Sequence, residues 1–299
     1  MAVSRTRQRA NERAKACFLR ACELDVAVRK PGNVSVASAG HGMTAESFLA
    51  SAKAAAAPLF QPGDRVGERV EAAVQASWAA AGCNTNLGIV LLCAPVARAV
   101  DLRPDATAPA DLREAIDGVL HELDLEDAQG AFRAIAQARP GGLGTAPDQD
   151  VNQPPSVDLR TAMGMAARRD SIARLYRDGY GPLFELVAAV FDPGSSFGPA
   201  SADGIVDAET VTAVQRLYLA LLGSVADSHI VRIHGEAVAH TVMAAAQRWQ
   251  RQVGRPGGVD SDPDFAAWDA SLKAERINPG TTADMTVAAL LIAGLTARP

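Results

Sequence analysis

The chain has 299 residues and a formal net charge of −5, with 48% hydrophobic and 21% charged residues. This balance excludes an intrinsically disordered protein, and the negative charge argues against a general nucleic-acid binder. A chain of this length buries roughly three quarters of the surface that it exposes when unfolded, so one large domain is feasible.

Cysteine usage and the N-terminal segment indicate a cytoplasmic protein. Cys17, Cys22, Cys83 and Cys93 lack CxxC spacing and lie among apolar residues, as reduced thiols in cytosolic proteins do. The basic N-terminal segment has no uninterrupted apolar stretch of the kind found in a secretory signal. Nowhere do about 18 apolar residues follow one another without a charge, so we expect no membrane partner.

Helical periodicity dominates the chain, and we expect an all-α fold, a single large multi-helical domain over 1–299. Thr44 is a candidate N-cap, and at 88–100 a short buried strand competes with a helix. The other expected helices cover 6–29, 45–57, 66–81, 110–121, 124–138, 158–178, 180–191, 207–225, 229–251, 262–275 and 282–297.

Three Gly- and Pro-rich breaks interrupt these helices, at 139–155, 192–204 and 254–263. Long irregular segments in a compact protein are either surface connections or functional loops. The first break contains ARPGGLGTAPDQDV, in which Gly141 and Gly142 can close over a phosphate chain. Its acidic residues Asp148 and Asp150 are candidate metal ligands, although a flexible connector explains the segment as well.

The loop KPGNVSVASAGHG at 30–42 is a candidate anion site. Its glycines and serines offer backbone N–H groups, and Lys30 adds a mobile positive charge that suits phosphate. We expect Gly32, Asn33 and Ser35 to take part in binding, and His41 to orient a substrate. An ordinary helix end followed by a loop is the competing interpretation.

Polar residues between two apolar helices form another candidate, AAGCNTNLGIV at 80–90. Asn84 and Thr85 lead this cluster, and buried amides are costly unless they are satisfied. The cluster therefore either caps the next helix or binds a ligand.

Two acidic helix starts follow later in the chain. Asp227 precedes Ser228 and His229, and it is either a simple N-cap or a functional carboxylate. The segment INPGTTADMTVAAL at 277–290 has Thr281 three residues before Asp284, which is the capping-box pattern. A carboxylate in the first turn of a helix can also ligate Mg²⁺.

These segments, taken in order, resemble the ATP:dephospho-coenzyme A triphosphoribosyltransferase family. The likeness lies in the KPG loop, the G-x-N-T-x-x-G segment at 82–88, the Asp-led segment at 227 and the P-G-x-x-A-D segment at 279–284. The middle stretch AMGMAARRDSIARLY at 162–176 is similar to the archaeal and methylotroph branch of that family.

The resemblance implies a helical, Mg²⁺-dependent transferase that uses ATP as a ribosyl donor. An acceptor hydroxyl attacks C1′ of the ribose, adenine leaves, and the triphosphate stays on the transferred sugar. Such chemistry needs neutralisation of the triphosphate, a general base and protonation of adenine. The acceptor implied is dephospho-CoA or a related cofactor precursor.

The resemblance also suggests roles for the candidate residues. Lys30 and the glycines of the 139–155 break would face phosphates, and Asn84 and Thr85 would position a nucleotide or acceptor. Acid–base or metal chemistry would fall to Asp227 and Asp284. The catalytic set is Asp227, Asp284 and Lys30. The binding set is Lys30, Gly32, Asn33, Ser35, Asn84, Thr85, Gly141, Gly142, Asn278 and Gly280; the metal set is Asp227, Asp284 and Asp150.

One departure from the family pattern keeps other functions open. Family members carry His-Lys-Gly after the Asn-Thr pair, where this chain has Asn86-Leu87-Gly88. The first alternative is a phosphoribosyl- or phosphate-transferring enzyme in tetrahydromethanopterin or methanofuran synthesis. The second is a non-catalytic nucleotide-binding protein. A homodimer is compatible with each of them.

Overall fold

The computed structural model describes residues 2–36, 38, 40, 43–191, 206–255 and 257–297, and the side chains from residue 5 onward. This part of the chain forms fourteen α-helices and, apart from two isolated bridges, no strand, which confirms the all-α prediction. His41 and the whole of the 192–204 break lie outside the described residues. The assignment of 1–299 to one domain stays a prediction.

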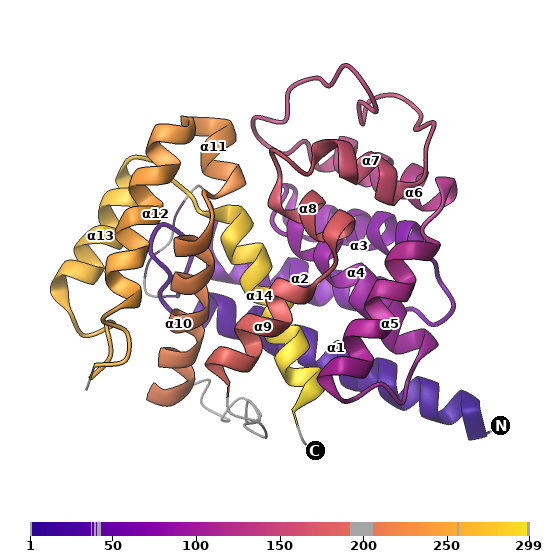
Figure 1. Cartoon of the computed structure of the whole chain (residues 1–299), viewed down its shortest axis with the longest axis horizontal. Coiled ribbons are helices and arrows are strands. Elements are labelled where there is room, and N and C mark those ends of the chain that lie inside the picture. The colour runs from indigo at the N-terminus through magenta and orange to yellow at the C-terminus, as the bar shows by residue number, and fades with distance from the viewer. Residues whose placement is uncertain are drawn as a thin grey trace.

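Figure 1 labels the helices in chain order. Their bounds are α1 (Ala2–Ala27), α2 (Ala45–Leu59), α3 (Val66–Ala81), α4 (Leu87–Leu102), α5 (Pro109–Glu122), α6 (Leu125–Ala138), α7 (Leu159–Ala166), α8 (Ser171–Asp178), α9 (Gly181–Val190), α10 (Ala208–Ser224), α11 (Ser228–His234), α12 (Glu236–Gln250), α13 (Pro263–Ala274) and α14 (Gly280–Thr296).

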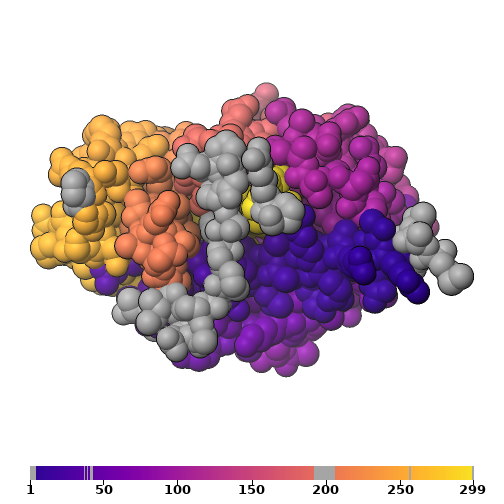
Figure 2. All heavy atoms as spheres, turned by 90° about the horizontal axis from the view of Figure 1, so that it is seen from below, coloured from indigo at the N-terminus to yellow at the C-terminus, as the bar shows by residue number. Residues whose placement is uncertain are grey.

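Helix α14 lies between two groups of helices, with α10–α13 on one side and α1–α8 on the other (Figure 1). It packs against α1, α4, α9 and α10. Nearly all of its residues are buried, as expected for a helix that is apolar on every face. Figure 2 shows the C-terminal group at one end of the molecule and the N-terminal half at the other.

Helix α4 is the second buried helix, and two tyrosines compensate for a proline inside it. Pro95 has no N–H, so the carbonyl of Leu91, four residues earlier, loses its helical partner. The Tyr176 hydroxyl donates to that carbonyl at 2.6 Å, and the Tyr180 hydroxyl donates to the Leu92 carbonyl at 2.8 Å. These bonds fix α8 and α9 against α4.

Helices α3 and α6 cross at two glycines. A Cβ on Gly67 would lie 2.6 Å from the Asp127 backbone, and one on Gly130 would lie 2.5 Å from the Gly67 carbonyl oxygen. The Gly67 N–H donates to Asp127 at 2.8 Å across this crossing. Only glycine permits so close an approach of the two backbones.

A charged cluster around Asp101 fastens α1, α3 and α4 together. The Asp101 side chain is fully buried and pairs with Arg7 at 2.5 Å, Arg69 at 3.0 Å and Arg98 at 3.4 Å. It also accepts hydrogen bonds from Asn11 and from the Gly63 N–H, each at 2.9 Å. A buried carboxylate needs such a complete set of donors.

The structure corrects two helix predictions and decides a third. The 158–178 segment is two helices, because Asp170 accepts from the Ala173 N–H and so begins α8. The 229–251 segment also divides, because Gly235 adopts a positive φ of 87° that ends α11. The 88–100 stretch is helix, not strand. Thr44 caps α2 in a capping box, as predicted. No described helix is long and apolar enough to span a bilayer.

Candidate active site

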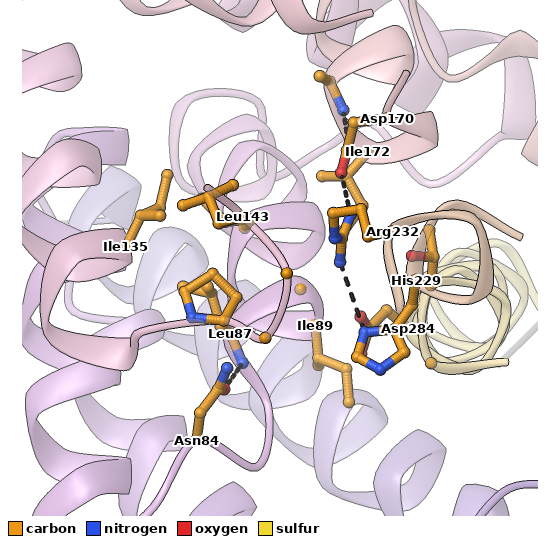
Figure 3. Close-up of a pocket in the computed structure, with 18 of the residues that line it drawn as sticks. Asn84, Leu87, Ile89, Ile135, Leu143, Asp170, Ile172, His229, Arg232 and Asp284 are labelled. Carbon is orange, nitrogen blue, oxygen red and sulfur yellow. Dashed lines mark hydrogen bonds and ion pairs between the residues drawn. The ribbon is translucent and has the colours of Figure 1, made fainter. Parts of the chain in front are cut away.

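A cavity of about 380 Å³ opens where the two groups of helices meet. The first turns of α4, α8 and α14 line it, together with side chains of α11 and the loops around 33, 84 and 140–151. Figure 3 shows labelled side chains from all of these elements except the first loop. The cavity therefore gathers segments that are far apart in the sequence.

The two Pro-Gly loops predicted to form the site are in direct contact. A Cβ on Gly32, which has a φ of 83°, would lie 2.7 Å from Pro279 and 2.9 Å from the Ile277 carbonyl oxygen. Asn33 donates to the Asn278 side chain at 3.0 Å. Both asparagines line the cavity, as does Gly280. Gly32 does not line it, and its N–H donates to Asp269 at 2.8 Å.

Lys30 does not form part of the cavity wall. Its side chain is fully buried, and its Nζ lies 3.0 Å from both Asp25 and Asn33 and 5.9 Å from the ring centre of Tyr218. Lys30 is not among the residues that line the cavity, although Asp25 is. A direct contact of Lys30 with phosphate would require this buried pair to open.

Ser35 is likewise absent from the cavity wall. It is buried, and its N–H donates to the Ser38 carbonyl at 3.0 Å. Its hydroxyl has no partner among the described residues. Ser35 therefore belongs to the interior of the loop and not to the surface that a ligand in this cavity would touch.

The asparagine-threonine segment before α4 presents unused polar groups to the cavity. Asn84 accepts from the Leu87 N–H at 3.2 Å, which is a capping role. The Thr85 hydroxyl and the Asn86 amide nitrogen are buried without a partner in the described residues. The N–H groups of Gly88 and Ile89 likewise meet no acceptor there. Buried polar groups of this kind call for a ligand.

The 140–151 loop forms one wall of the cavity. Gly141 and Gly142 pass beside α11, where a Cβ on Gly142 would lie 2.8 Å from Ile233. Asp150 organises the loop, because it accepts from the Ala146 N–H and from the N–H and side chain of Asn152, each at 2.9 Å. The hydrogen bonds from Asn152 and Ala146 lower the pKa of Asp150.

Asp227 is the N-cap of α11 and also holds the start of α14. One of its oxygens accepts from the N–H groups of His229 at 2.9 Å and Ile230 at 3.0 Å. The other accepts from the Thr282 N–H and hydroxyl, each at 2.7 Å. Asp227 does not line the cavity. It positions His229 and Asp284, and its lone pairs are already engaged.

Asp284 lines the cavity and has no hydrogen-bond partner in the described residues (Figure 3). It lies against Gly88, where any Cβ would collide with the carboxylate. Burial, together with the negative charges of Asp25 and Asp227, raises the pKa of Asp284 well above its ordinary value, and Arg232 opposes this only in part. A carboxyl in such surroundings keeps its proton to unusually high pH.

The expected capping box at Thr281 is wrong. Helix α14 begins at Gly280, and its N-cap residue Pro279 makes no side-chain capping hydrogen bond. Thr281 is buried, and the Asp284 carboxylate makes no capping hydrogen bond in the described residues. The pattern failed because Asp227, from another helix, supplies the acceptor for this end of α14.

Sequence reasoning gave no role to the charged groups on the α8–α11 side of the cavity. Arg232 donates to Asp170 at 2.8 Å, and its Nη2 lies 3.5 Å from Nδ1 of His229 (Figure 3). Arg169 and Asp25 also line the cavity. Arg169 and Asp170 lie in the 162–176 stretch that resembles the family, and this resemblance could have indicated a functional role for them. No sequence pattern points to Asp25, which lies in an apolar segment.

The predicted metal ligands do not come together. Among the described residues, no group of three or more His, Cys, Asp or Glu side chains has the proximity to hold a metal ion. Asp227 and Asp150 have committed their oxygens to N–H and O–H donors. The trio Asp227, Asp284 and Asp150 thus does not form a preassembled protein cage.

Comparison with known proteins decides the family. The model of the family described as ATP:dephospho-CoA triphosphoribosyl transferase matches residues 11–298. The chain belongs to this family. It is therefore a transferase, and the reaction of its family is triphosphoribosyl transfer from ATP to dephospho-CoA. The predicted resemblance is confirmed, and ATP as substrate agrees with the open, polar helix starts around the cavity.

A solved structure of similar fold is that of a "putative triphosphoribosyl-dephospho-coA synthase" from Archaeoglobus fulgidus. It is 24% identical to this chain, covers 84% of this chain and 98% of its own, and superposes with a TM-score of 0.62. At this identity the likeness supports the fold alone. No curated protein matches the chain.

Proposed function

We propose that this cavity carries out the family reaction, with Asp284 as the residue that moves the proton. The reaction breaks the bond between C1′ of the ATP ribose and adenine, and forms a bond from C1′ to an acceptor hydroxyl. Asp284 first gives its proton to the departing adenine. It then takes the proton of the acceptor hydroxyl as the new bond closes, so that the carboxyl is restored.

The observation that carries this proposal is the state of the Asp284 carboxyl. It faces the cavity, has no hydrogen-bond partner among the described residues and has a raised pKa. A general acid must hold its proton and be accessible to the leaving group, and a raised pKa together with a position on the cavity wall favours both. Asp227, in contrast, is suited to holding α11 and α14 in place.

The ligand-binding groups follow from the unused polar atoms. Thr85 and Asn86 would hold sugar or base, and the N–H groups at the start of α4 would face phosphate oxygens. Asn33 and Asn278 would contact the same ligand from the joined Pro-Gly loops. The apolar wall, which includes Phe48, would cover the uncharged parts of donor or acceptor.

Mg²⁺ would enter this site with ATP and not as a resident ion. Mg²⁺ is commonly held by substrate phosphates, water and one or two carboxylates, so it needs no three-residue cage. Asp148 on the 140–151 loop lines the cavity and would be the carboxylate to approach such a complex, since the oxygens of Asp150 already accept hydrogen bonds. With ATP as donor, we place the enzyme in the cytoplasm.

Free adenine is the product that tests the proposal. The protein would be incubated with ATP, Mg²⁺ and dephospho-CoA, and adenine and the triphosphoribosylated product would be followed by chromatography and mass spectrometry. We expect both in equal amounts, and neither without dephospho-CoA. Adenine without the coupled product, or no adenine at all, would contradict the proposed acceptor or the proposed reaction.

A further inference from the structure

Binding of ATP places a triphosphate near this cavity, and its negative charge needs a cation. Lys30 is held in a buried pair with Asp25 and does not reach the cavity wall. Of the Lys and Arg side chains in the described residues, the two that line the cavity are Arg169 and Arg232. Neither belongs to the set of residues that sequence reasoning assigned to phosphate.

The Arg232 guanidinium is held in one orientation with donors to spare. Its Nη1 donates to Asp170 at 2.8 Å, while its Nε is buried and has no partner among the described residues. Asp170 is fixed in turn, because its other oxygen accepts from the Ala173 N–H at 3.0 Å. Figure 3 shows Arg232 between Asp170 and His229 at the cavity.

The glycine loop that lines the cavity passes beside Arg232. A Cβ on Gly142 would approach the Arg232 carbonyl oxygen to 3.1 Å, so the glycine loop lies directly along this residue. Arg169 is exposed at the same side of the cavity, adjacent to Asp170, and forms no ion pair in the described part of the chain. A guanidinium suits phosphate because its donors match two oxygens at once.

We infer that Arg232, oriented by Asp170, is the main binding residue for the triphosphate of ATP, with Arg169 as a weaker second cation. Lys30 then has a structural role, which is to neutralise Asp25 beneath the Pro-Gly loops. This inference rests on the proposed function for the identity of the ligand. It concerns binding, however, and is testable without turnover.

Calorimetric titration with inorganic tripolyphosphate, ATP and adenosine separates the phosphate site from the rest of the cavity. We expect Arg232→Ala to weaken tripolyphosphate and ATP about 10- to 100-fold, as loss of a charge-assisted hydrogen bond does, and to leave adenosine unchanged. Arg169→Ala should weaken both anions by less than about fivefold, since it is exposed. Arg168→Ala, an exposed neighbour outside the cavity wall, is the matched control.

Two further variants separate a binding role from a folding role. Arg232→Lys keeps the charge but loses the planar fork, so its affinity for tripolyphosphate should fall between those of the wild type and the alanine variant. Asp170→Asn removes the charge that orients Arg232, and we expect weaker binding of ATP with adenosine still unchanged. Circular dichroism of each variant would verify that the helices are intact.

The outcomes distinguish this inference from the proposed function. Equal binding of tripolyphosphate by the wild type and Arg232→Ala, or no binding of tripolyphosphate and ATP by the wild type, overturns the inference. Binding that depends on Arg232 supports it even where no adenine is released, and in that case only the proposed reaction fails.

Discussion

Two carboxylates in the helical interior, Asp101 and Asp284, have opposite surroundings. Asp101 is fully buried and meets three arginines, an asparagine and a backbone N–H. Asp284 faces a cavity and has no hydrogen-bond donor in the described residues. Donors of the protein itself occupy the Asp101 carboxylate, whereas the Asp284 carboxyl is available to a ligand.

The two surroundings move the pKa in opposite directions. Burial alone would raise the pKa of Asp101, but hydrogen bonds from Arg7, the Gly63 N–H and Asn11 and the charge of Arg69 bring it well below its ordinary value. At Asp284 burial dominates, and the raised pKa keeps the proton on. The saturated carboxylate therefore stabilises the fold, whereas the open one is equipped to transfer a proton.

Replacing Asp284 should have the largest effect on activity. Asp284→Asn keeps the shape of the side chain but removes the transferable proton. We expect adenine release to fall about 10²- to 10⁴-fold, with ATP affinity and the unfolding temperature nearly unchanged. Steady-state rates and calorimetry would measure the two effects. An active Asp284→Asn protein would remove Asp284 from the mechanism.

Replacing Asp101 should lower the stability of the protein and leave its activity unchanged. Asp101→Asn leaves buried Arg69 without its counter-ion and should cost about 3–5 kcal/mol in the free energy of unfolding, measured by urea denaturation. Because the folded pKa of Asp101 is lowered, its contribution is present above the unfolded pKa and is lost as the pH falls below about 4. The difference from the wild type should shrink there.

The control for Asp101 is an exposed aspartate four residues later in the chain. Asp105 forms an exposed pair with Arg103 at 3.9 Å, and Asp105→Asn should change stability by less than about 0.5 kcal/mol. The adenine-release rate per folded molecule should be unchanged in both variants. A loss of activity in folded Asp101→Asn would break the contrast between the two sites.

The pH profile tests the direction of the Asp284 shift. A carboxyl with a raised pKa keeps its proton to higher pH than an ordinary aspartate and loses it as the pH rises through the raised value. Adenine release should therefore be level at lower pH and decline about tenfold per unit above the pKa. The residual activity of Asp284→Asn should show no such decline, and a profile that rises with pH would contradict the acid role.

Gly88 offers a way to disturb Asp284 without changing it. A Cβ at this position collides with the carboxylate, so Gly88→Ala should cost about 1–3 kcal/mol in stability and also lower the rate of adenine release. In an Asp284→Ala background the same substitution should cost less, because the closest obstacle is gone and only the end of the Ile172 side chain, at 2.9 Å, has to move. Additive losses in this double-mutant cycle would show that the two residues are not coupled.

The sequence predicts the helices well because their apolar periodicity is a local property. It also indicates the Pro-Gly loops, which the structure joins at Gly32 and Pro279. It does not reveal that Lys30 forms a buried ion pair with Asp25, since this contact depends on where the end of α1 lies inside the protein. The capping box at Thr281 failed for a related reason: the acceptor comes from Asp227, in another helix.

The last prediction concerns the support of α4, the helix on which Gly88 lies against Asp284. Tyr176→Phe removes the donor to the Leu91 carbonyl, which Pro95 leaves without a helical partner. A buried acceptor left unsatisfied costs about 1–3 kcal/mol. Tyr180→Phe should cost less, since the Leu92 carbonyl retains the N–H four residues later. Urea denaturation would rank the two variants, and the reverse order would contradict the compensation for Pro95.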